Sequence, residues 1–241
     1  MAELVYKDCR IYHGGYDLSA KHSEMSITLK AEMKDRTTFT ASSRQRKAGL
    51  IEAELSGSGF WDVSGLDDVL FEGVAVDDGV LTVCPTDGTQ GELAYIMKAV
   101  DGEYVPGESI GELLAFNFAA YSQTPLVRAV VMETGAKTVT ADGTAQQMSS
   151  GVLATQKMYA ALHCTAVSGT DTPTISIALY SNSSDTWDGS ETLRHTFTDI
   201  TEIGAQMAEI SGAITDTWWR AEWTITGTDP SLTITLSMGI K

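Results

Sequence analysis

Strict alternation of apolar and polar residues marks two neighbouring segments near the N-terminus. Residues 27–34 alternate along one extended segment, in the order Ile27, Thr28, Leu29, Lys30, Ala31, Glu32, Met33 and Lys34. Residues 50–56 repeat the pattern, with Ile51, Ala53 and Leu55 on one face and Glu52, Glu54 and Ser56 on the other. A period of two is typical of strands that bury one face and wet the other. We therefore predict a β-hairpin whose apolar face is buried.

The connection between these two strands, residues 35–49, is long and basic. It contains Phe39 and three closely spaced cations, Arg44, Arg46 and Lys47. A connection of about 12–15 residues without secondary structure is uncommon in a compact domain unless it has a function of its own. We therefore predict that loop 35–49 makes a functional contact.

The remainder of the chain predicts further short strands and one short helix. The helix is expected over residues 66–71, and apolar runs separated by turns recur through the C-terminal third. Such a series predicts a mainly β chain of antiparallel sandwich or barrel architecture. A turn-rich stretch at 101–107 divides it, so we predict a β-barrel domain over 1–107 and a second β-sandwich domain over 108–241.

Charge changes this picture by pointing to self-association. The chain has 241 residues, 16 Lys+Arg and 32 Asp+Glu, and a formal net charge of −16, which disfavours general nucleic-acid binding. Residues 1–50 nevertheless carry nine Lys/Arg and six Asp/Glu, a net of +3, so residues 51–241 carry −19. A basic segment on one copy is attracted to the acidic body of another. The chain shows neither a secretory signal nor an apolar run long enough for a membrane span, so neither is expected.

Candidate chemistry is sparse. The four histidines lack metal-ligand spacing, the three cysteines are widely spaced, and no phosphate-binding loop or nucleophile motif is present. We expect no catalytic, cofactor or metal site, with His163 as an exposed strand residue and the cysteines as reduced thiols. The oxygen-rich loop 184–191 leaves a bound ion as an open alternative. Trp187 and Trp218 are candidates for exposed aromatic platforms.

At this point the order of motifs in the first 105 residues resembles a known family. The residues that carry the resemblance are Tyr12-His13-Gly14-Gly15-Tyr16-Asp17-Leu18, the strand 27–34, Thr37-Thr38-Phe39 with a basic tip, Gly49-Leu50, Gly57-Ser58-Gly59-Phe60-Trp61-Asp62, and 80–85 with Gly91. This succession resembles the major tail tube proteins of long-tailed, non-contractile bacteriophages. Residues 150–241, around Trp218 and Trp219, look similar to C-terminal β-regions of phage virion proteins.

The resemblance implies a non-enzymatic structural protein of the virion. Its subunits would close into hexameric rings that stack into a hollow tail tube, contact other tail proteins and let DNA pass without specific binding. Assembly would take place in the host cytoplasm, with no membrane and no cofactor. The hairpin strands would line the lumen through Thr28, Lys30, Glu32, Lys34, Glu52, Glu54 and Ser56. The tip, with Phe39, Arg44, Arg46 and Lys47, would reach the adjacent ring. The charged residues of that lumen set sum to only −1.

Two alternatives from other classes stay open. Trp187 and Trp218 favour a carbohydrate- or receptor-binding β-sandwich of a virion. Scattered carboxylates such as Asp67 and Asp68 are all that supports a hydrolase with a carboxylate pair.

Overall fold

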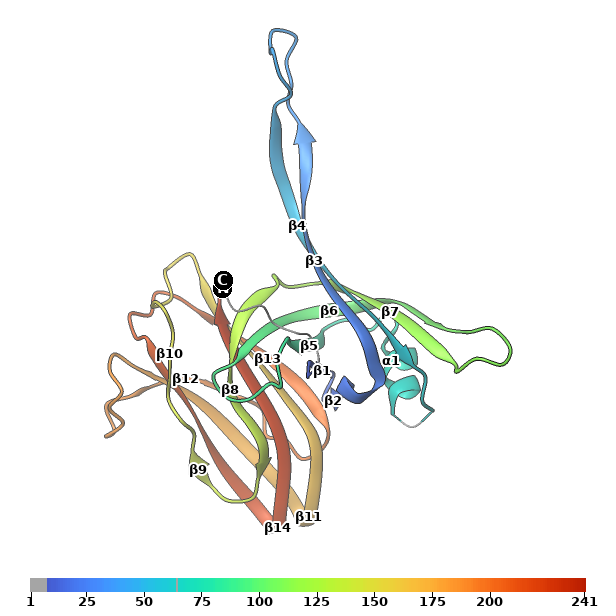
Figure 1. Ribbon diagram of the computed structural model, residues 1–241. Coiled ribbons are helices and arrows are strands. Elements are labelled where there is room, and N and C mark those ends of the chain that lie inside the picture. Colours follow the sequence, from blue (N-terminus) through green and yellow to red (C-terminus); the bar gives the residue numbers. More distant parts are fainter. Residues whose placement is uncertain (1–7, 64) are drawn as a thin grey trace. The chain divides into compact units, whose positions relative to one another are not determined.

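The computed structural model describes residues 8–63 and 65–241, and it confirms a mainly β chain with antiparallel strand pairs (Figure 1). One α-helix lies in the described part of the chain, α1 (Leu66–Gly73), where the short helix was predicted. A 3-10 turn covers Ser19–Lys21. The strands are β1 (Arg10–His13), β2 (Tyr16–Asp17), β3 (His22–Asp35), β4 (Arg46–Phe60), β5 (Gly79–Cys84), β6 (Leu93–Pro106), β7 (Ala115–Ser122), β8 (Val127–Lys137), β9 (Ala141–Asp142), β10 (Gln146–Gln147), β11 (Lys157–Asn182), β12 (Thr192–Thr196), β13 (Gly204–Ser211) and β14 (Trp218–Ile240).

The chain folds into two compact units that are discontinuous in sequence. Unit 1 comprises residues 8–20, 79–97 and 127–241, and unit 2 comprises residues 21–78 and 98–126. The predicted boundary at residue 107 falls within unit 2, in the connection between β6 and β7. Those strands pair with one another, with Pro106 opposite Phe116, so the turn-rich stretch belongs to a hairpin.

Unit 1 is built around the long β11–β14 pair. The register runs from Met158 opposite Ile240 to Asn182 opposite Trp218. Two of the turns expected in the C-terminal third, at residues 168–171 and 227–230, are irregularities within this ladder, because register shifts there bend the strands without ending them. The left-handed backbone at Gly169 and Gly227 permits the bend, since a side chain at Gly169 would meet the Asp229 backbone at 2.9 Å.

The expectation that His163 is exposed is wrong. The first half of β11 is buried on both faces, with Met158, Ala160 and Leu162 in one apolar cluster and Tyr159 and Ala161 in another. His163 shares the second face, where it is fully buried and its Nε2 lies 2.9 Å from the Thr82 hydroxyl. Burial, assisted by the nearby His13, lowers the pKa of His163 to about 3. Because this face carries polar residues, the alternating pattern did not indicate that it is also buried.

Unit 2 is a four-stranded sheet in the order β3-β4-β7-β6, together with α1. The helix buries Leu66 and Leu70. Asp67, in its first turn, accepts hydrogen bonds from the Trp61 indole at 3.0 Å and the Tyr104 hydroxyl at 2.6 Å. These bonds lower the pKa of Asp67, while burial and the same carboxylate raise the pKa of Tyr104 to about 12. The helix is thereby linked to β6.

The glycine-rich end of β4 is explained by close packing in the same unit. His22 contacts the rings of Phe116 and Phe118 edge-on, with centroids 5.1 and 5.3 Å apart. A side chain at Gly57 would meet Phe118 at 2.7 Å and His22 at 3.0 Å. Gly57 therefore allows the aromatic cluster to lie against the strand.

Candidate functional site

The outer part of the β3–β4 hairpin extends beyond the rest of unit 2 as a two-stranded ribbon (Figure 1). β7 pairs with β4 only over residues 54–60, so the ribbon consists of the end of β3 and the start of β4. The ladder continues to Asp35 opposite Arg46. The connecting loop is therefore residues 36–45, shorter than the predicted 35–49, because Arg46 and Lys47 pair with β3.

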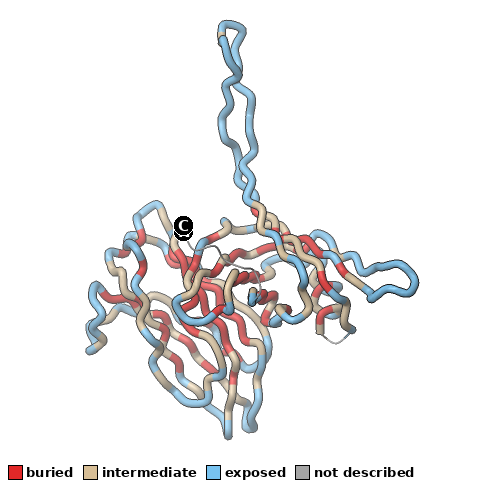
Figure 2. Tube along the Cα trace, in the orientation of Figure 1, coloured by how far each residue is buried: buried red, intermediate tan, exposed pale blue. Residues whose placement is uncertain are grey.

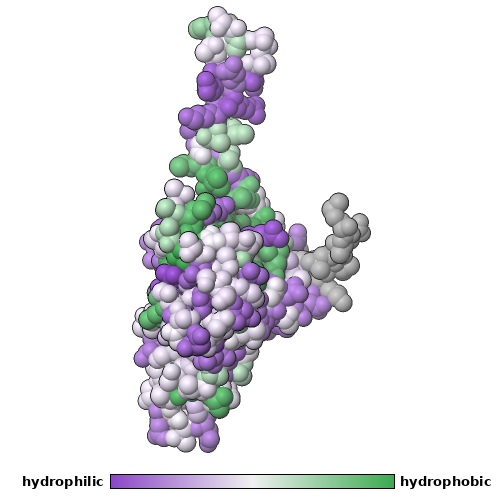
Figure 3. All heavy atoms as spheres, turned by 90° about the vertical axis from the view of Figure 1, so that its left-hand side faces the viewer, coloured by the Kyte–Doolittle hydropathy of each residue, from purple (hydrophilic) through white to green (hydrophobic). Residues whose placement is uncertain are grey.

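The apolar face of this ribbon is exposed, which corrects the expectation that it is buried. Ala53 and Leu55 are buried on β4 near its pairing with β7. Leu29, opposite Ala53 on the edge strand β3, is 54% exposed, and farther out Met33 is 60% and Ile51 65% exposed. Leu50, beside the bulge in the ladder, is 82% exposed. We call Leu29, Met33, Leu50 and Ile51 the apolar flank. Figure 2 shows the exposed ribbon, and Figure 3 shows its hydrophobic band below a hydrophilic one nearer the tip.

The polar face of the ribbon gathers the residues predicted to line a lumen. The register sets Thr28 opposite Glu54, Lys30 opposite Glu52, Ser26 opposite Ser56 and Lys34 opposite Lys47. Lys30 forms an ion pair with Glu54 at 3.5 Å, and Lys34 pairs with Glu32 two residues earlier on the same strand. All seven predicted positions thus belong to one polar surface.

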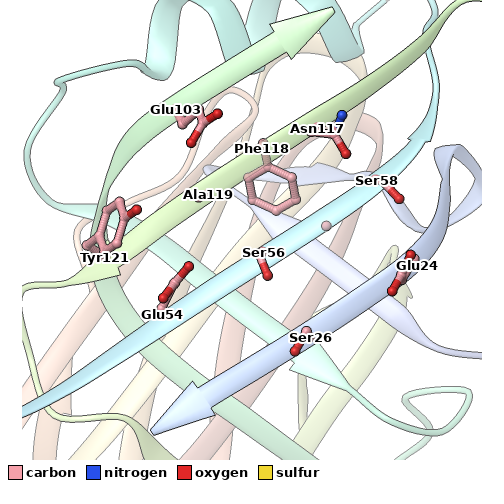
Figure 4. A pocket seen from close by; sticks show the side chains of 11 residues that line it. Glu24, Ser26, Glu54, Ser56, Ser58, Glu103, Asn117, Phe118, Ala119 and Tyr121 are labelled. Carbon is pink, nitrogen blue, oxygen red and sulfur yellow. The ribbon is translucent and has the colours of Figure 1, made fainter. Parts of the chain in front are cut away.

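A hollow of about 320 Å³ lies on this polar face (Figure 4). Besides Glu54 and Ser56, its lining includes six polar residues that were not predicted: Glu24, Ser26, Ser58, Glu103, Asn117 and Tyr121. Adding Glu24 and Glu103 to the predicted set changes its formal charge from −1 to −3. Glu24 shares the parity of Ser26 and Thr28 and could have been found; Glu103 required knowledge that β6 and β7 pair across a bulge.

The tip of the hairpin is ordered by its own hydrogen bonds. Asp35 accepts a bond from the Thr37 amide at 2.8 Å, and bonds to the side chain and backbone of Thr37 lower the pKa of Asp35. The Gln45 amide donates to the Thr37 hydroxyl at 2.9 Å, and the Arg36 amide donates to the Gln45 carbonyl at 2.9 Å. Phe39 is fully exposed at the end of this loop.

The hairpin tip carries a net positive charge that is not neutralised by ion pairs within the described residues. Residues 35–47 carry Arg36, Arg44, Arg46 and Lys47 against Asp35, a net of +3. Within residues 8–63 and 65–241, no ion pair involves any of these four cations. Positive charge and an aromatic side chain are thus presented together.

The two candidate aromatic platforms lie in unit 1, and both are half-buried. The Arg220 guanidinium stacks on Trp187 at 4.4 Å, and the Trp187 indole donates to Asp185 at 2.9 Å. Trp218 lies on β14 opposite Asn182 of β11 and Gln147 of β10. In loop 184–191, Glu191 and Asp188 accept bonds from the loop amides of Gly189 and Ser190.

Other candidate chemistry is limited in the described residues. No group of three or more His, Cys, Asp or Glu is placed to hold a metal ion there. Burial raises the pKa of the Cys84 thiol to about 12 and also raises that of Cys164. Among the helices described, none has the length and apolar character needed to cross a bilayer.

Comparisons with known proteins give distant likenesses. No protein-family model matches the chain, and no curated protein matches it. Among solved structures, a chain from the virion of a native gene transfer agent particle shares 19% identity over 52% of this chain and 98% of its own, with a TM-score of 0.41. A chain from the tail of an empty gene transfer agent particle with C6 symmetry shares 17% identity over 45% and 81%, with a TM-score of 0.36.

A third likeness spans nearly the whole chain. The SPP1 Dit protein, a hub adsorption apparatus protein of phages that infect Gram-positive bacteria, shares 13% identity over 98% of this chain and 100% of its own, with a TM-score of 0.39. At these identities and TM-scores the likenesses carry no argument about this chain. Its fold class rests on the strands described above.

Proposed function

We propose that this protein is a structural, non-enzymatic subunit of a phage tail that assembles with copies of itself into stacked rings around a channel for DNA. The observation that carries the proposal is the apolar flank of the hairpin. Leu29, Met33 and Ile51 lie on the apolar side of the β3–β4 ladder, and each is more than half exposed in the single subunit. The ladder continues past a register shift between Ala31 and Met33. A contiguous apolar surface of this kind is typical of an interface.

The open edge of β3 supports assembly between copies. In the described sheet, β3 pairs only with β4, so its other edge presents backbone donors and acceptors along residues 22–35. Such an edge is a template for strand addition from another chain. A strand added at this edge continues the sheet in its own plane, so another element of the same neighbouring copy would have to pack on the apolar flank. Both contacts would then belong to one ring interface. The number six for the ring is the one that the resemblance implies.

The polar face gives the ring a channel suited to DNA passage. When the apolar flank is covered, the opposite face remains in water with Glu24, Glu52, Glu54 and Glu103. Carboxylates repel phosphates, whereas each unpaired cation would bind one and slow its movement. Lys30 and Lys34 both form ion pairs with glutamates. Lys47, which forms none within the described residues, lies opposite Lys34 near the tip. A surface of this composition favours passage without binding.

The proposal is tested by concentrating the purified protein and following its mass by light scattering, with negative-stain electron microscopy of the same samples. We expect rings or short tubes. A protein that stays monomeric at all concentrations and salt conditions contradicts the proposal. Leu29→Ser with Ile51→Ser, which removes part of the apolar flank, is the variant expected to lower assembly.

Carbohydrate binding by unit 1 is a second candidate function. The outward residues of β14 bring an aromatic ring, a guanidinium and a carboxylate together as Trp218, Arg220 and Glu222, with Trp187 stacked on Arg220. Aromatic faces beside polar groups are suited to sugars. Binding to a glycan panel that is lost in Trp218→Ala and kept in Val139→Ala, an exposed site in the same unit, supports this role. A panel without any binding contradicts it.

A further inference from the structure

An apolar groove lies between α1 and β6 within unit 2. It has a volume of about 510 Å³ and is lined by Phe71, Val74, Gly102, Glu103 and Tyr104. Phe71 is 70% exposed and Val74 is 40% exposed. An exposed phenylalanine beside a groove is typical of a surface that binds another protein.

The shape of the groove depends on a glycine. A side chain at Gly102 would meet the Tyr121 ring at 2.5 Å, so this part of β6 must stay without one. Tyr104, on the same strand, is held to α1 through its bond to Asp67. Gly102 and the Tyr104–Asp67 hydrogen bond therefore determine the shape of the groove.

The rim of the groove is strongly acidic. Residues 61–79 carry six Asp or Glu and not one Lys, Arg or His. Asp68 and Glu72 are exposed and lie four residues apart on α1, so they share a helix face near Phe71. Glu103 of β6 also borders the groove, although its side chain lines the hollow on the polar face (Figure 4).

The hairpin tip has the complementary chemistry. Phe39 is fully exposed and is accompanied by Arg36, Arg44, Arg46 and Lys47, with a net charge of +3 over residues 35–47. An aromatic side chain fits an apolar groove, and cations fit a carboxylate rim. Within one subunit the tip lies at the far end of the hairpin from α1 (Figure 1). The tip therefore cannot reach the groove of its own subunit, whereas a second copy presents the same groove.

We propose that the tip of one copy docks into the α1–β6 groove of a second copy. Phe39 enters the groove beside Phe71 and Val74, and the tip cations lie against Asp68 and Glu72. The inference rests on the proposed function, because it names the surface on the next ring that receives the tip. It makes ring stacking a contact between two surfaces of the same protein.

The test is site-specific cross-linking between two full-length variants. Phe39→Cys is mixed with Val74→Cys, both carrying Cys9→Ser, because Cys84 and Cys164 are buried. A short bismaleimide then reports heterodimers on a denaturing gel. The matched control pairs Phe39→Cys with Leu153→Cys, an exposed position in unit 1. We expect about tenfold more cross-linking at the groove, since docking raises the effective concentration of the two thiols.

Charge reversal makes the test specific for the rim. Asp68→Lys with Glu72→Lys, introduced into the groove variant, lowers cross-linking to the control level. Arg44→Glu with Arg46→Glu in the tip variant restores it. Salt weakens the wild-type contact, as the Debye length falls from about 10 Å at 0.1 M to about 3 Å at 1 M. Circular dichroism confirms that each variant is folded.

Failure of docking and failure of the proposed function are separable. Rings or tubes with cross-linking no higher than the Leu153 control overturn the docking and leave the assembly. Strong groove cross-linking without rings supports the docking and overturns the ring. Background cross-linking without rings overturns both.

Discussion

Replacing two residues of the apolar flank should weaken assembly without weakening the fold. The change is Leu29→Ser with Ile51→Ser. Both side chains are more than half exposed in the single subunit, at 54% and 65%, so little packing is lost within it. Exposed substitutions of this kind change the free energy of unfolding by within about 0.5 kcal/mol.

The expected loss of association follows from the exposed fractions. Full burial of a Leu or Ile side chain contributes about 1.5–3 kcal/mol. Covering the exposed 54% of Leu29 and 65% of Ile51 therefore contributes roughly 2–3.5 kcal/mol together at one interface. This corresponds to about 30- to 300-fold in the association constant, since about 1.4 kcal/mol is tenfold.

Sedimentation velocity across a concentration series measures this shift. The concentration at which half of the protein is assembled should rise by about that factor, while the thermal midpoint stays unchanged. The control is Val139→Ser with Leu153→Ser in unit 1, where exposure is 67% and 64%. An equal shift in both double variants, or none in the hairpin variant, refutes the interface on the apolar flank.

Three further predictions follow from other parts of the chain. Arg44→Glu with Arg46→Glu and Lys47→Glu should block stacking of rings but leave the fold unchanged, because these side chains make no ion pair within the described subunit; normal tubes in the electron microscope contradict the role of the tip. Acidification should destabilise unit 1, because the pKa of His163 lies at about 3 in the fold and at 6.5 when unfolded, so the unfolded state binds the proton first as the pH falls. The loss should reach on the order of 3 kcal/mol by about pH 4 in urea unfolding, and His163→Gln should remove that part of the pH dependence; an unchanged profile is the contrary result. Gly57→Ala should lower the free energy of unfolding by about 1–3 kcal/mol through its clash with Phe118 and His22, whereas Gly107→Ala, which meets nothing within 4 Å, should not; equal midpoints for the two variants oppose this reading.

Periodicity predicted the strands well because most of them bury one face. Leu162, Ile177 and Leu236 are all fully or almost fully buried, as their parity indicates. The helix at Leu66–Gly73 was also expected. These features depend on local pattern alone, and that pattern can be seen directly in the sequence.

Periodicity failed where a second surface decides the outcome. The face of His163 is polar in sequence but lies in a second core. The apolar flank has the pattern of a buried strand, yet Leu29 and Ile51 are more than half exposed among the described residues. In the first case the covering layer comes from distant segments such as β5. In the second, we propose that it comes from another copy.

Only part of the candidate site was predicted, because local pattern identifies the residues that share a face of one strand but not those that distant strands add to it. Thr28, Lys30 and Glu54 share a polar face because alternation fixes it within one strand pair. Tyr121 joins that face through the pairing of β7 with β4, and Glu103 joins it through the pairing of β6 with β7. Local pattern specifies neither pairing. We propose that the signal for assembly in this sequence is the apolar flank, which has the pattern of a buried face but is exposed in the single subunit.

Negative-stain electron microscopy of the concentrated wild-type protein tests the central claim most directly. The account predicts closed rings and, at higher concentration, hollow tubes of stacked rings. Leu29→Ser with Ile51→Ser should give single particles under the same conditions. A wild-type field of monomers, or irregular aggregates without a central channel, would contradict the account.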